Sequence, residues 1–186
     1  MARHYSGWHL KRASQEIENG GVIGYPTETV YGLGCDPWNE KAVFKILTIK
    51  KRPVHKGLIV IAADISQLDP LINFPSQQIK AQIVSTWPGP FTWILPTSEH
   101  CPKWLSGQHD GLAVRVSSHP LCLALCKLTG PIVSTSANVA NQPPAGSGWE
   151  VQMKFNDQLD YILHENLPKK VSPTSIQDAV TGKKIR

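Results

Sequence analysis

Residues 57–63 read GLIVIAA, a continuous apolar run. A strand that is covered on both faces has this pattern, whereas a strand with one face in water alternates apolar and polar residues. Further short apolar runs occur along the chain, at residues 22–25, 91–95, 112–116 and 131–133. Stretches in which apolar residues have helical spacing separate these runs. The alternation predicts an α/β fold with a mixed, largely buried sheet.

Start and stop signals place the helices between these strands. The clearest helix is expected to begin after Asn39, a good N-cap residue, and to end before Pro53. Other helices are predicted at residues 5–19, 66–72, 76–86, 120–128 and 149–155. Short strands are predicted near residues 161–163, 175–176 and 183–185. Because no repeat or linker divides the chain, we expect one domain over residues 1–186.

Length and composition exclude several classes of protein. The chain has 186 residues, of which 41% are hydrophobic, and this is enough for a compact domain with a hydrophobic core. No apolar run approaches the roughly 18 residues of a transmembrane helix, and the N-terminus lacks the apolar segment of a signal peptide. The 4 cysteines show no metal-ligand spacing. Together these observations predict a cytoplasmic protein with reduced thiols and no membrane association.

The positive charge is concentrated in one segment. The chain carries 19 Lys and Arg against 14 Asp and Glu, a net charge of +5. Residues 41–56 contain basic residues and no acidic one, while the rest of the chain is close to neutral. Such a run is either a solvated helix face or a site for an anion such as phosphate, a nucleotide or nucleic acid. Cations near a helix C-terminus also interact favourably with the helix dipole, so the run alone leaves both interpretations open.

Three polar constellations remain once the common nucleotide motifs are excluded, since neither GxxxxGK[ST] nor a complete GxGxxG occurs. PTET at 26–29 and YGLG at 31–34 are predicted to form a loop at the end of a strand, where hydroxyls and glycines allow a small polar ligand to approach closely. In KKRP at 50–53, lysine offers an anion a mobile point charge and arginine offers it a planar, forked guanidinium. STSAN at 134–138 offers hydroxyls and an amide for phosphate oxygens or an oxyanion. Each can instead be a turn or a cap; together they predict an anion pocket.

In this order along the chain, the segments resemble the YrdC-like family, in particular its short bacterial members. The matching segments are GVIGYPTETVYGLGCDP, LTIKKRPVHKGLIVIA, WPGPFTWILP, GLAVRV, PIVSTSAN and PTSIQDAVTGKKIR. The resemblance covers about residues 8–186. It implies a single-domain, open, twisted, mixed sheet with flanking helices and a basic cavity. It also implies an L-threonylcarbamoyladenylate synthase, a nucleotidyltransferase that condenses L-threonine, bicarbonate and ATP and releases pyrophosphate.

The resemblance also implies roles for individual residues. The catalytic and nucleotide-binding group comprises Lys50, Arg52, Ser136 and Asn138. The substrate-binding group comprises Thr27, Tyr31, Arg115 and Thr135, and further nucleotide-side positions are Thr174 and Arg186. ATP is the implied substrate, accompanied by Mg²⁺ held through its phosphates rather than by a dedicated metal site. No tightly bound cofactor is implied, and the product passes to partner proteins that modify tRNA beside the anticodon.

The chain departs from the longer relatives at two positions. Ile61 stands where they have a histidine, and Pro144 where they have a serine; those relatives also have a second domain. The alternative function is a non-catalytic RNA-binding module, which would contact tRNA or double-stranded RNA through phosphates during tRNA or rRNA maturation. The 6 tryptophans are dispersed, so no aromatic platform for base stacking accompanies the cations. An enzyme of tRNA modification could also touch tRNA.

Overall fold

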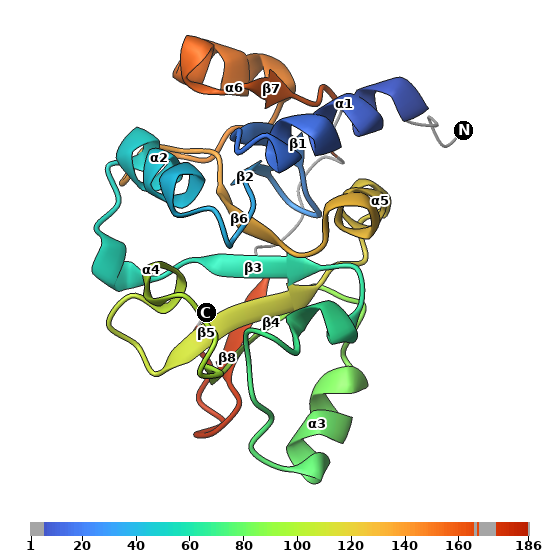
Figure 1. Ribbon diagram of the computed structural model, residues 1–186, viewed down its shortest axis with the longest axis vertical. Coiled ribbons are helices and arrows are strands. Elements are labelled where there is room, and N and C mark those ends of the chain that lie inside the picture. The colour runs from blue at the N-terminus through green and yellow to red at the C-terminus, as the bar shows by residue number, and fades with distance from the viewer. Residues whose placement is uncertain (1–5, 166, 168–173, 186) are drawn as a thin grey trace.

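The computed structural model describes residues 6–165, 167 and 174–185. Within these residues the strands form one eight-stranded sheet of order β7-β1-β2-β6-β3-β5-β4-β8 (Figure 1). The strands are β1 Ile23–Pro26, β2 Tyr31–Gly34, β3 Ile59–Ala62, β4 Phe91–Pro96, β5 Gly111–Val116, β6 Ile132–Ser136, β7 Tyr161–Ile162 and β8 Ser175–Asp178. Parallel and antiparallel pairs both occur, β3 being parallel to β5 and antiparallel to β6. The predicted α/β fold with an open mixed sheet is therefore confirmed.

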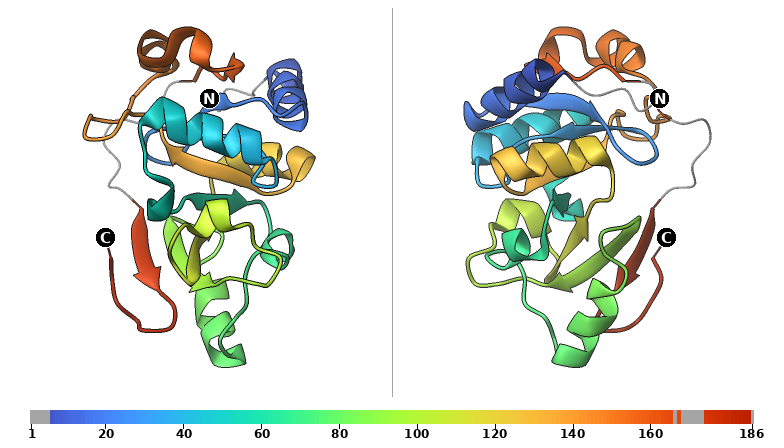
Figure 2. Two further views of the ribbon diagram at one scale, coloured as in Figure 1. Left: turned by 60° about the vertical axis from the view of Figure 1, so that its left-hand side comes forward. Right: turned by 90° about the vertical axis from the view of Figure 1, so that its right-hand side faces the viewer.

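Helices cover both faces of the sheet (Figure 2). They are α1 Gly7–Glu18, α2 Glu40–Lys50, α3 Gln77–Val84, α4 Lys103–Ser106, α5 Pro120–Thr129 and α6 Gly148–Phe155, with short 3₁₀ turns η1 Val54–Lys56, η2 Ile65–Leu68 and η3 Asn156–Gln158. Helices α1 and α5 pack with Ile61 and Ile132 into one hydrophobic cluster. Helix α2 belongs to a larger cluster that includes Val60 and Val114. Because alternate residues of a strand point to opposite faces, β3 is buried on both sides, as its apolar run predicts.

Local sequence explains the bounds of α2. The Asn39 side chain accepts a hydrogen bond from the backbone N–H of Ala42 at 3.1 Å, as expected of an N-cap. The helix ends at Lys50; the C-cap residue Lys51 has a left-handed backbone with φ of 50°, and Pro53 follows two residues later. The left-handed residue Lys51 therefore lies between Lys50, the last residue of the helix, and Arg52, which follows the change of chain direction.

The structure corrects four predicted elements. Residues 31–34 form strand β2 rather than a loop, and the sequence hides it because two of its four residues are glycine, which is uncommon in strands. Strand β6 continues to Ser136, so the hydroxyls of the STSAN segment lie largely within the strand. Of the helix predicted at 66–72, only the 3₁₀ turn η2 forms. At 183–185 a single bridge pairs Lys184 with Gln177 instead of a strand.

Glycines in β2 make room for a large side chain of the neighbouring strand. A Cβ atom at Gly34 would lie 2.7 Å from the ring of Tyr25 and 2.9 Å from the carbonyl oxygen of Val133. Tyr25 is fully buried, and its hydroxyl donates to Ser134 Oγ at 2.7 Å. The glycines thus let Tyr25 reach across β2 and fix a hydroxyl of β6.

Two further sequence predictions concern thiols and membranes. All four cysteines are free and buried, in line with the prediction of reduced thiols. Among the helices of the described part of the chain, none combines the length and the apolar character needed to cross a membrane.

Candidate active site

A cavity of about 990 Å³ lies on one face of the sheet. Its floor crosses the neighbouring strands β2, β6, β3, β5, β4 and β8. Alternate residues of a strand share a face, and on β5 the lining residues are Gly111, Ala113 and Arg115. Where the same face continues toward α1 and α5, apolar side chains fill it. The cavity is therefore the part of this face that no helix covers.

The first polar constellation forms one wall of the cavity. Thr27 and Tyr31 both line it. The Thr27 hydroxyl and backbone N–H both donate to the Val30 carbonyl, at 2.7 and 3.1 Å, which closes a tight turn. The Tyr31 hydroxyl donates to the carbonyl oxygen of Glu165 at 2.6 Å. Burial raises the pKa of Tyr31, so its hydroxyl stays protonated and contributes no charge.

Lys50 is held in the protein interior beside the STSAN segment. Its side chain donates to the carbonyl oxygen of Ser136, to that of Asn138 at 2.8 Å and to Asn138 Oδ1 at 3.2 Å. Lys50 is 4% exposed and does not belong to the described cavity lining. Burial, and then the nearby charge of Arg52, lower the pKa of Lys50 to about 8. In this structure Lys50 fixes the backbone at the end of β6 instead of presenting a free ammonium to the cavity.

Arg52 does line the cavity, together with Lys56. The Arg52 guanidinium donates from Nε to the carbonyl oxygen of Gly57 at 3.1 Å, and from Nη2 to the same oxygen at 2.9 Å. Burial lowers its pKa, but an arginine stays charged at any ordinary pH. Because its partners are neutral carbonyl groups, the charge of Arg52 is available to an anion in the cavity.

The STSAN segment places three hydroxyl residues in the cavity lining. Ser134, Thr135 and Ser136 line the cavity, whereas Asn138 does not belong to the described lining. Ser136 Oγ donates to Asn138 Oδ1 at 2.6 Å, and Asn138 Nδ2 donates to the carbonyl oxygen of Gln142 at 2.8 Å. Asn138 therefore links Ser136, Lys50 and the following loop into one network.

Arg115 forms a buried ion pair with Glu28, so the alternative interpretation of this residue, a salt-bridged arginine at a strand end, describes its state in this structure. Its Nη2 lies 3.3 Å from Glu28 Oε2, and its Nη1 lies 3.3 Å from the hydroxyls of Thr92 and of Thr174. Ser117 Oγ donates to Glu28 Oε1 at 2.6 Å. Burial opposes ionisation of Glu28, but the Arg115 charge and the Ser117 hydrogen bond together hold its pKa below the ordinary value. The sequence does show an acidic residue, Glu28, between two threonines of the first polar constellation, but nothing in the sequence identifies Arg115 as its partner.

The cavity thus collects most of the predicted site residues, though not all. Among the described lining, the basic residues are Arg52, Lys56 and Arg115, and the acidic residues are Asp110 and Asp178. Arg186 lies outside the described residues. The two departures from the longer relatives lie apart, because Pro144 lines the cavity whereas Ile61 is buried under α1 and α5.

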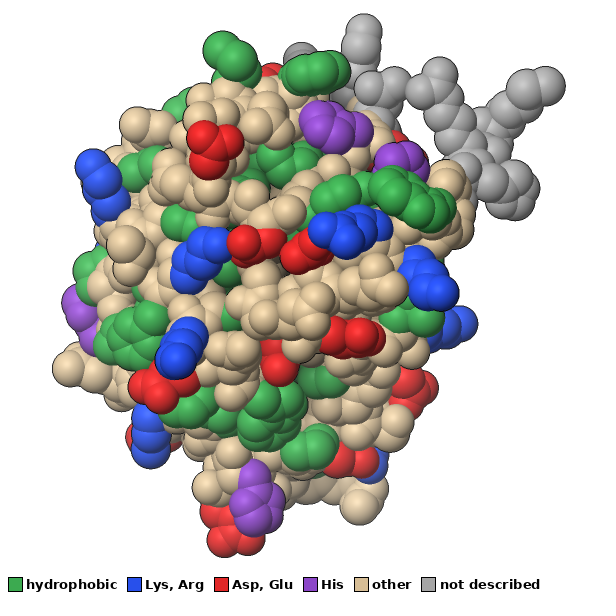
Figure 3. Space-filling view, turned by 45° about the horizontal axis from the view of Figure 1, so that its top comes forward, with side chains coloured by type: hydrophobic (Ala, Val, Ile, Leu, Met, Phe, Trp, Pro, Cys, Tyr) green, Lys and Arg blue, Asp and Glu red, His purple; other side chains and the backbone are tan. Residues whose placement is uncertain are grey.

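The basic run at 41–56 does not form one patch. Lys45 pairs with Asp160 at 2.6 Å on the surface, Lys50 is buried, and only Arg52 and Lys56 of the run line the cavity. On the face that carries α1 and α6, basic and acidic side chains alternate (Figure 3). A broad surface of one charge, which non-specific RNA binding would use, is not present on that face.

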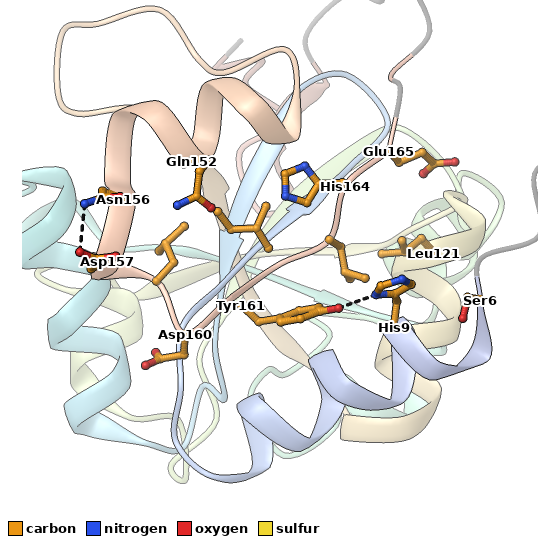
Figure 4. A pocket seen from close by; sticks show the side chains of 13 residues that line it. Ser6, His9, Leu121, Gln152, Asn156, Asp157, Asp160, Tyr161, His164 and Glu165 are labelled. Carbon is orange, nitrogen blue, oxygen red and sulfur yellow. Dashed lines mark hydrogen bonds between the residues drawn. The ribbon is translucent and has the colours of Figure 1, made fainter.

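A second cavity of about 580 Å³ lies between α1, α6 and the segment around β7 (Figure 4). The His9 ring nitrogen Nδ1 lies 2.6 Å from the Tyr161 hydroxyl across it. Asp160 lines this cavity too, but its carboxylate is bound by Lys45 and by the backbone N–H of Val22. Within this cavity His9 pairs with Tyr161 and Asn156 with Asp157, whereas Asp160 is bound by residues outside the lining.

This protein is of the α/β class, with an open mixed sheet. One face of the sheet carries a cavity that is lined by hydroxyl residues and by cations. Residues 15–186 match the Sua5, YciO and YrdC family, described as "Telomere recombination". The chain belongs to this family, and the resemblance predicted from its sequence motifs is confirmed. It is 50% identical over 181 residues to a threonylcarbamoyl-AMP synthase of Pseudomonas aeruginosa (strain UCBPP-PA14), a match that covers 97% of this chain and 98% of the relative.

Solved structures of the family have the same fold. P. abyssi Sua5, determined with L-threonine bound, is 32% identical and superposes with a TM-score of 0.88 over 95% of this chain. The match covers 52% of the Sua5 chain, so this protein spans about half the length of that relative. E. coli YciO is 27% identical, with a TM-score of 0.82 over 94% of this chain and 85% of its own.

Proposed function

We propose that this protein is a threonylcarbamoyl-AMP synthase, which condenses L-threonine, bicarbonate and ATP to L-threonylcarbamoyl-AMP and pyrophosphate. The main support is the cavity itself, whose lining combines Thr27 and Tyr31 with the buried Arg115 and the cations Arg52 and Lys56. The relatives that match almost the whole chain carry this activity in their name, and a relative is solved with L-threonine. Both support an enzyme over a non-catalytic RNA-binding module.

The reaction brings several negative charges into one cavity. The amine of threonine first combines with bicarbonate to give a carbamate and water. A carbamate oxygen then attacks the α-phosphorus of ATP, and the bond to the β-phosphate oxygen breaks, so pyrophosphate leaves with the electron pair. Holding the two anionic reactants in line is the main task of such a site. Arg52 and Lys56, which line the cavity with charges not neutralised by a described carboxylate, would hold the phosphates.

The remaining predicted residues have roles on either side of these phosphates. Thr135 would donate to phosphate or carbamate oxygens, stabilising charge where it develops. Ser136 would do the same once its hydroxyl proton, which Asn138 Oδ1 accepts in this structure, turns to the substrate. Lys50 and Asn138 would keep that strand end in place, because both bind within it. Arg115 would bind the threonine carboxylate, with Thr27 and Tyr31 beside it and Thr174 next to the guanidinium. Arg186 remains a predicted nucleotide-side residue.

Mg²⁺ fits the site as a companion of ATP. Within the described residues, no three His, Cys, Asp or Glu side chains gather as metal ligands. Of the two carboxylates in the described lining, that of Asp178 accepts from the backbone N–H groups of Val180 and Thr181. Mg²⁺ commonly binds through phosphates and one or two carboxylates, and its charge would assist departure of pyrophosphate. We further propose that the product is used by tRNA-modifying partner proteins in the cytoplasm.

Threonine-dependent release of pyrophosphate tests this function. Purified protein with ATP, Mg²⁺, bicarbonate and L-threonine should release pyrophosphate and form the adenylate, and omission of threonine should abolish both. Arg52→Ala should reduce turnover by about 100-fold or more, since it removes a charge from the reacting phosphates. Lys41→Ala is the matched control, because Lys41 is an exposed cation of the same basic run. Absence of threonine-dependent release from folded wild-type protein would refute the proposal. RNA binding with a steep salt dependence would then favour the alternative.

A further inference from the structure

Glu28 forms an ion pair with Arg115, the residue predicted to bind the carboxylate of the amino acid, yet it does not belong to the described lining of the cavity. Thr27 and Thr29, the residues on either side of it, do line the cavity. The Glu28 side chain turns the other way and is 11% exposed, against 6% for the side chain of Arg115. Glu28 is therefore placed behind Arg115, where it can act on a substrate only through the arginine.

The contacts of Glu28 determine the orientation of the Arg115 guanidinium. One carboxylate oxygen accepts from Arg115 Nη2 at 3.3 Å, and the other accepts from Ser117 Oγ at 2.6 Å. The hydroxyls of Thr92 and Thr174 lie at Nη1. With both terminal nitrogens engaged, the plane of the guanidinium is fixed, since its donors form a rigid fork. Arg115 Nε is buried and has no hydrogen-bond partner among the described residues, so one donor of the guanidinium is unused in a residue that lines the cavity.

The hydrogen bond from Ser117 holds the carboxylate of Glu28 in place. Ser117 is fully buried, and its hydroxyl accepts from the backbone N–H of His119 at 3.1 Å while it donates to Glu28. A chain of hydrogen bonds thus runs from the start of α5 through Ser117 and Glu28 to Arg115. Such chains restrict each member more than an isolated pair does.

We infer that Glu28 is a positioning residue that sets the affinity of the site for the carboxylate of the amino-acid substrate by fixing Arg115. The inference rests on the proposed function, and it adds a residue that carries no contact with the substrate. Without Glu28 the guanidinium would keep its charge but lose its fixed orientation. Binding of the amino acid should then weaken, while binding of ATP at Arg52 should be unaffected.

Direct binding measurements separate this role from a general structural one. In titration calorimetry with ATP and L-threonine as separate probes, Glu28→Gln should weaken L-threonine binding by about tenfold or more, the effect expected from a lost charge-assisted contact. Its affinity for ATP should stay within about twofold of wild type. L-threoninamide, which lacks the carboxylate, should bind wild type and Glu28→Gln equally. In turnover assays the same variant should raise KM for threonine with little change in kcat.

Two further variants guard against misfolding and against an indirect effect. Ser117→Ala removes only the hydroxyl that holds Glu28, so it should give a smaller loss of L-threonine affinity in the same direction. In the Arg115→Ala background, Glu28→Gln should cause no further loss, because Glu28 acts only through the arginine. Glu99→Gln is the matched control, since the Glu99 side chain is 86% exposed and faces only His100.

The outcomes distinguish this inference from the proposed function. Wild-type protein that neither binds L-threonine nor releases pyrophosphate would refute the function. Wild-type protein that does both, with a folded Glu28→Gln of unchanged L-threonine affinity, would refute the positioning role alone. An equal loss of L-threonine and ATP affinity in Glu28→Gln would also refute it, because that pattern indicates a general disturbance of the cavity.

Discussion

Lys50 and Arg115 are both cations buried near one cavity, with exposed fractions of 4% and 5%, but their surroundings differ. Arg115 faces the carboxylate of Glu28, whereas Lys50 faces two backbone carbonyls and an amide oxygen. A buried charge needs compensation from either an opposite charge or well-placed dipoles. Arg115 and Glu28 both stay charged at ordinary pH, whereas Lys50, which is surrounded by dipoles, is closer to losing its proton.

The comparison shows two ways to prepare a site for anions. At Arg115 the opposite charge is permanent, so the orientation of the guanidinium is set before a substrate arrives. At Lys50 no described carboxylate neutralises the ammonium, so its charge adds to that of Arg52 and the positive potential near the phosphates remains. The first arrangement favours geometric selection of a carboxylate, and the second favours attraction of a polyanion.

The largest expected effect comes from breaking the ion pair. Arg115→Met should lower the free energy of unfolding by about 3–5 kcal/mol, because it leaves Glu28 buried without its counter-charge. Urea unfolding measures the loss. The double variant Glu28→Gln/Arg115→Met should recover much of it, since no unpaired charge remains. A loss below about 1 kcal/mol, typical of exposed pairs, would show that water compensates Glu28.

A smaller effect is expected at Lys50. Lys50→Met removes the hydrogen bonds to the end of β6 but leaves no charge unpaired, so it should cost about 1–3 kcal/mol of unfolding free energy. The same urea experiment measures it, with Lys41→Met as the exposed control. A loss equal to that of Arg115→Met would contradict the distinction between the two surroundings.

The pH dependence of stability should also differ between the two cations. The pKa of Lys50 falls from 10.5 to about 8 on folding, so above about pH 8 the unfolded chain binds more protons at this residue than the native protein. The Lys50 contribution to stability should therefore rise with pH between about 8 and 10.5, by on the order of 1 kcal/mol per pH unit. The difference in unfolding free energy between wild type and Lys50→Met, followed across this range, isolates the effect. A flat difference would place the native pKa of Lys50 near its ordinary value.

The smallest effect is expected at a neutral partner of Arg115. Thr92 is 1% exposed, and its hydroxyl lies 3.3 Å from Arg115 Nη1. Thr92→Val keeps the shape of the side chain and removes the hydrogen bond from Arg115, which is already long. The substitution should therefore lower the free energy of unfolding by about 1 kcal/mol or less. Thermal unfolding is sensitive enough to detect this. A cost comparable with that of Arg115→Met would mean that Thr92, and not Glu28, mainly compensates the arginine.

Much of the fold could be predicted from local patterns. The apolar run at 57–63 and the capping residue Asn39 correspond to β3 and α2. Strand β2 escaped prediction because its glycines are there to accommodate Tyr25, and that requirement arises from a strand paired with it. The extent of β6 escaped for a similar reason, since its hydroxyl-rich end is stabilised by pairing with β2.

By itself, the sequence determined the α/β class, the three polar constellations and the family, because periodicity and motif order are properties of the linear chain. Only the tertiary structure decided how the charges are used. It separated the basic run into surface, buried and cavity residues, and it brought Glu28 against Arg115 across 87 positions of sequence. The reason is physical, since burial and charge compensation depend on neighbours that the sheet assembles from distant segments.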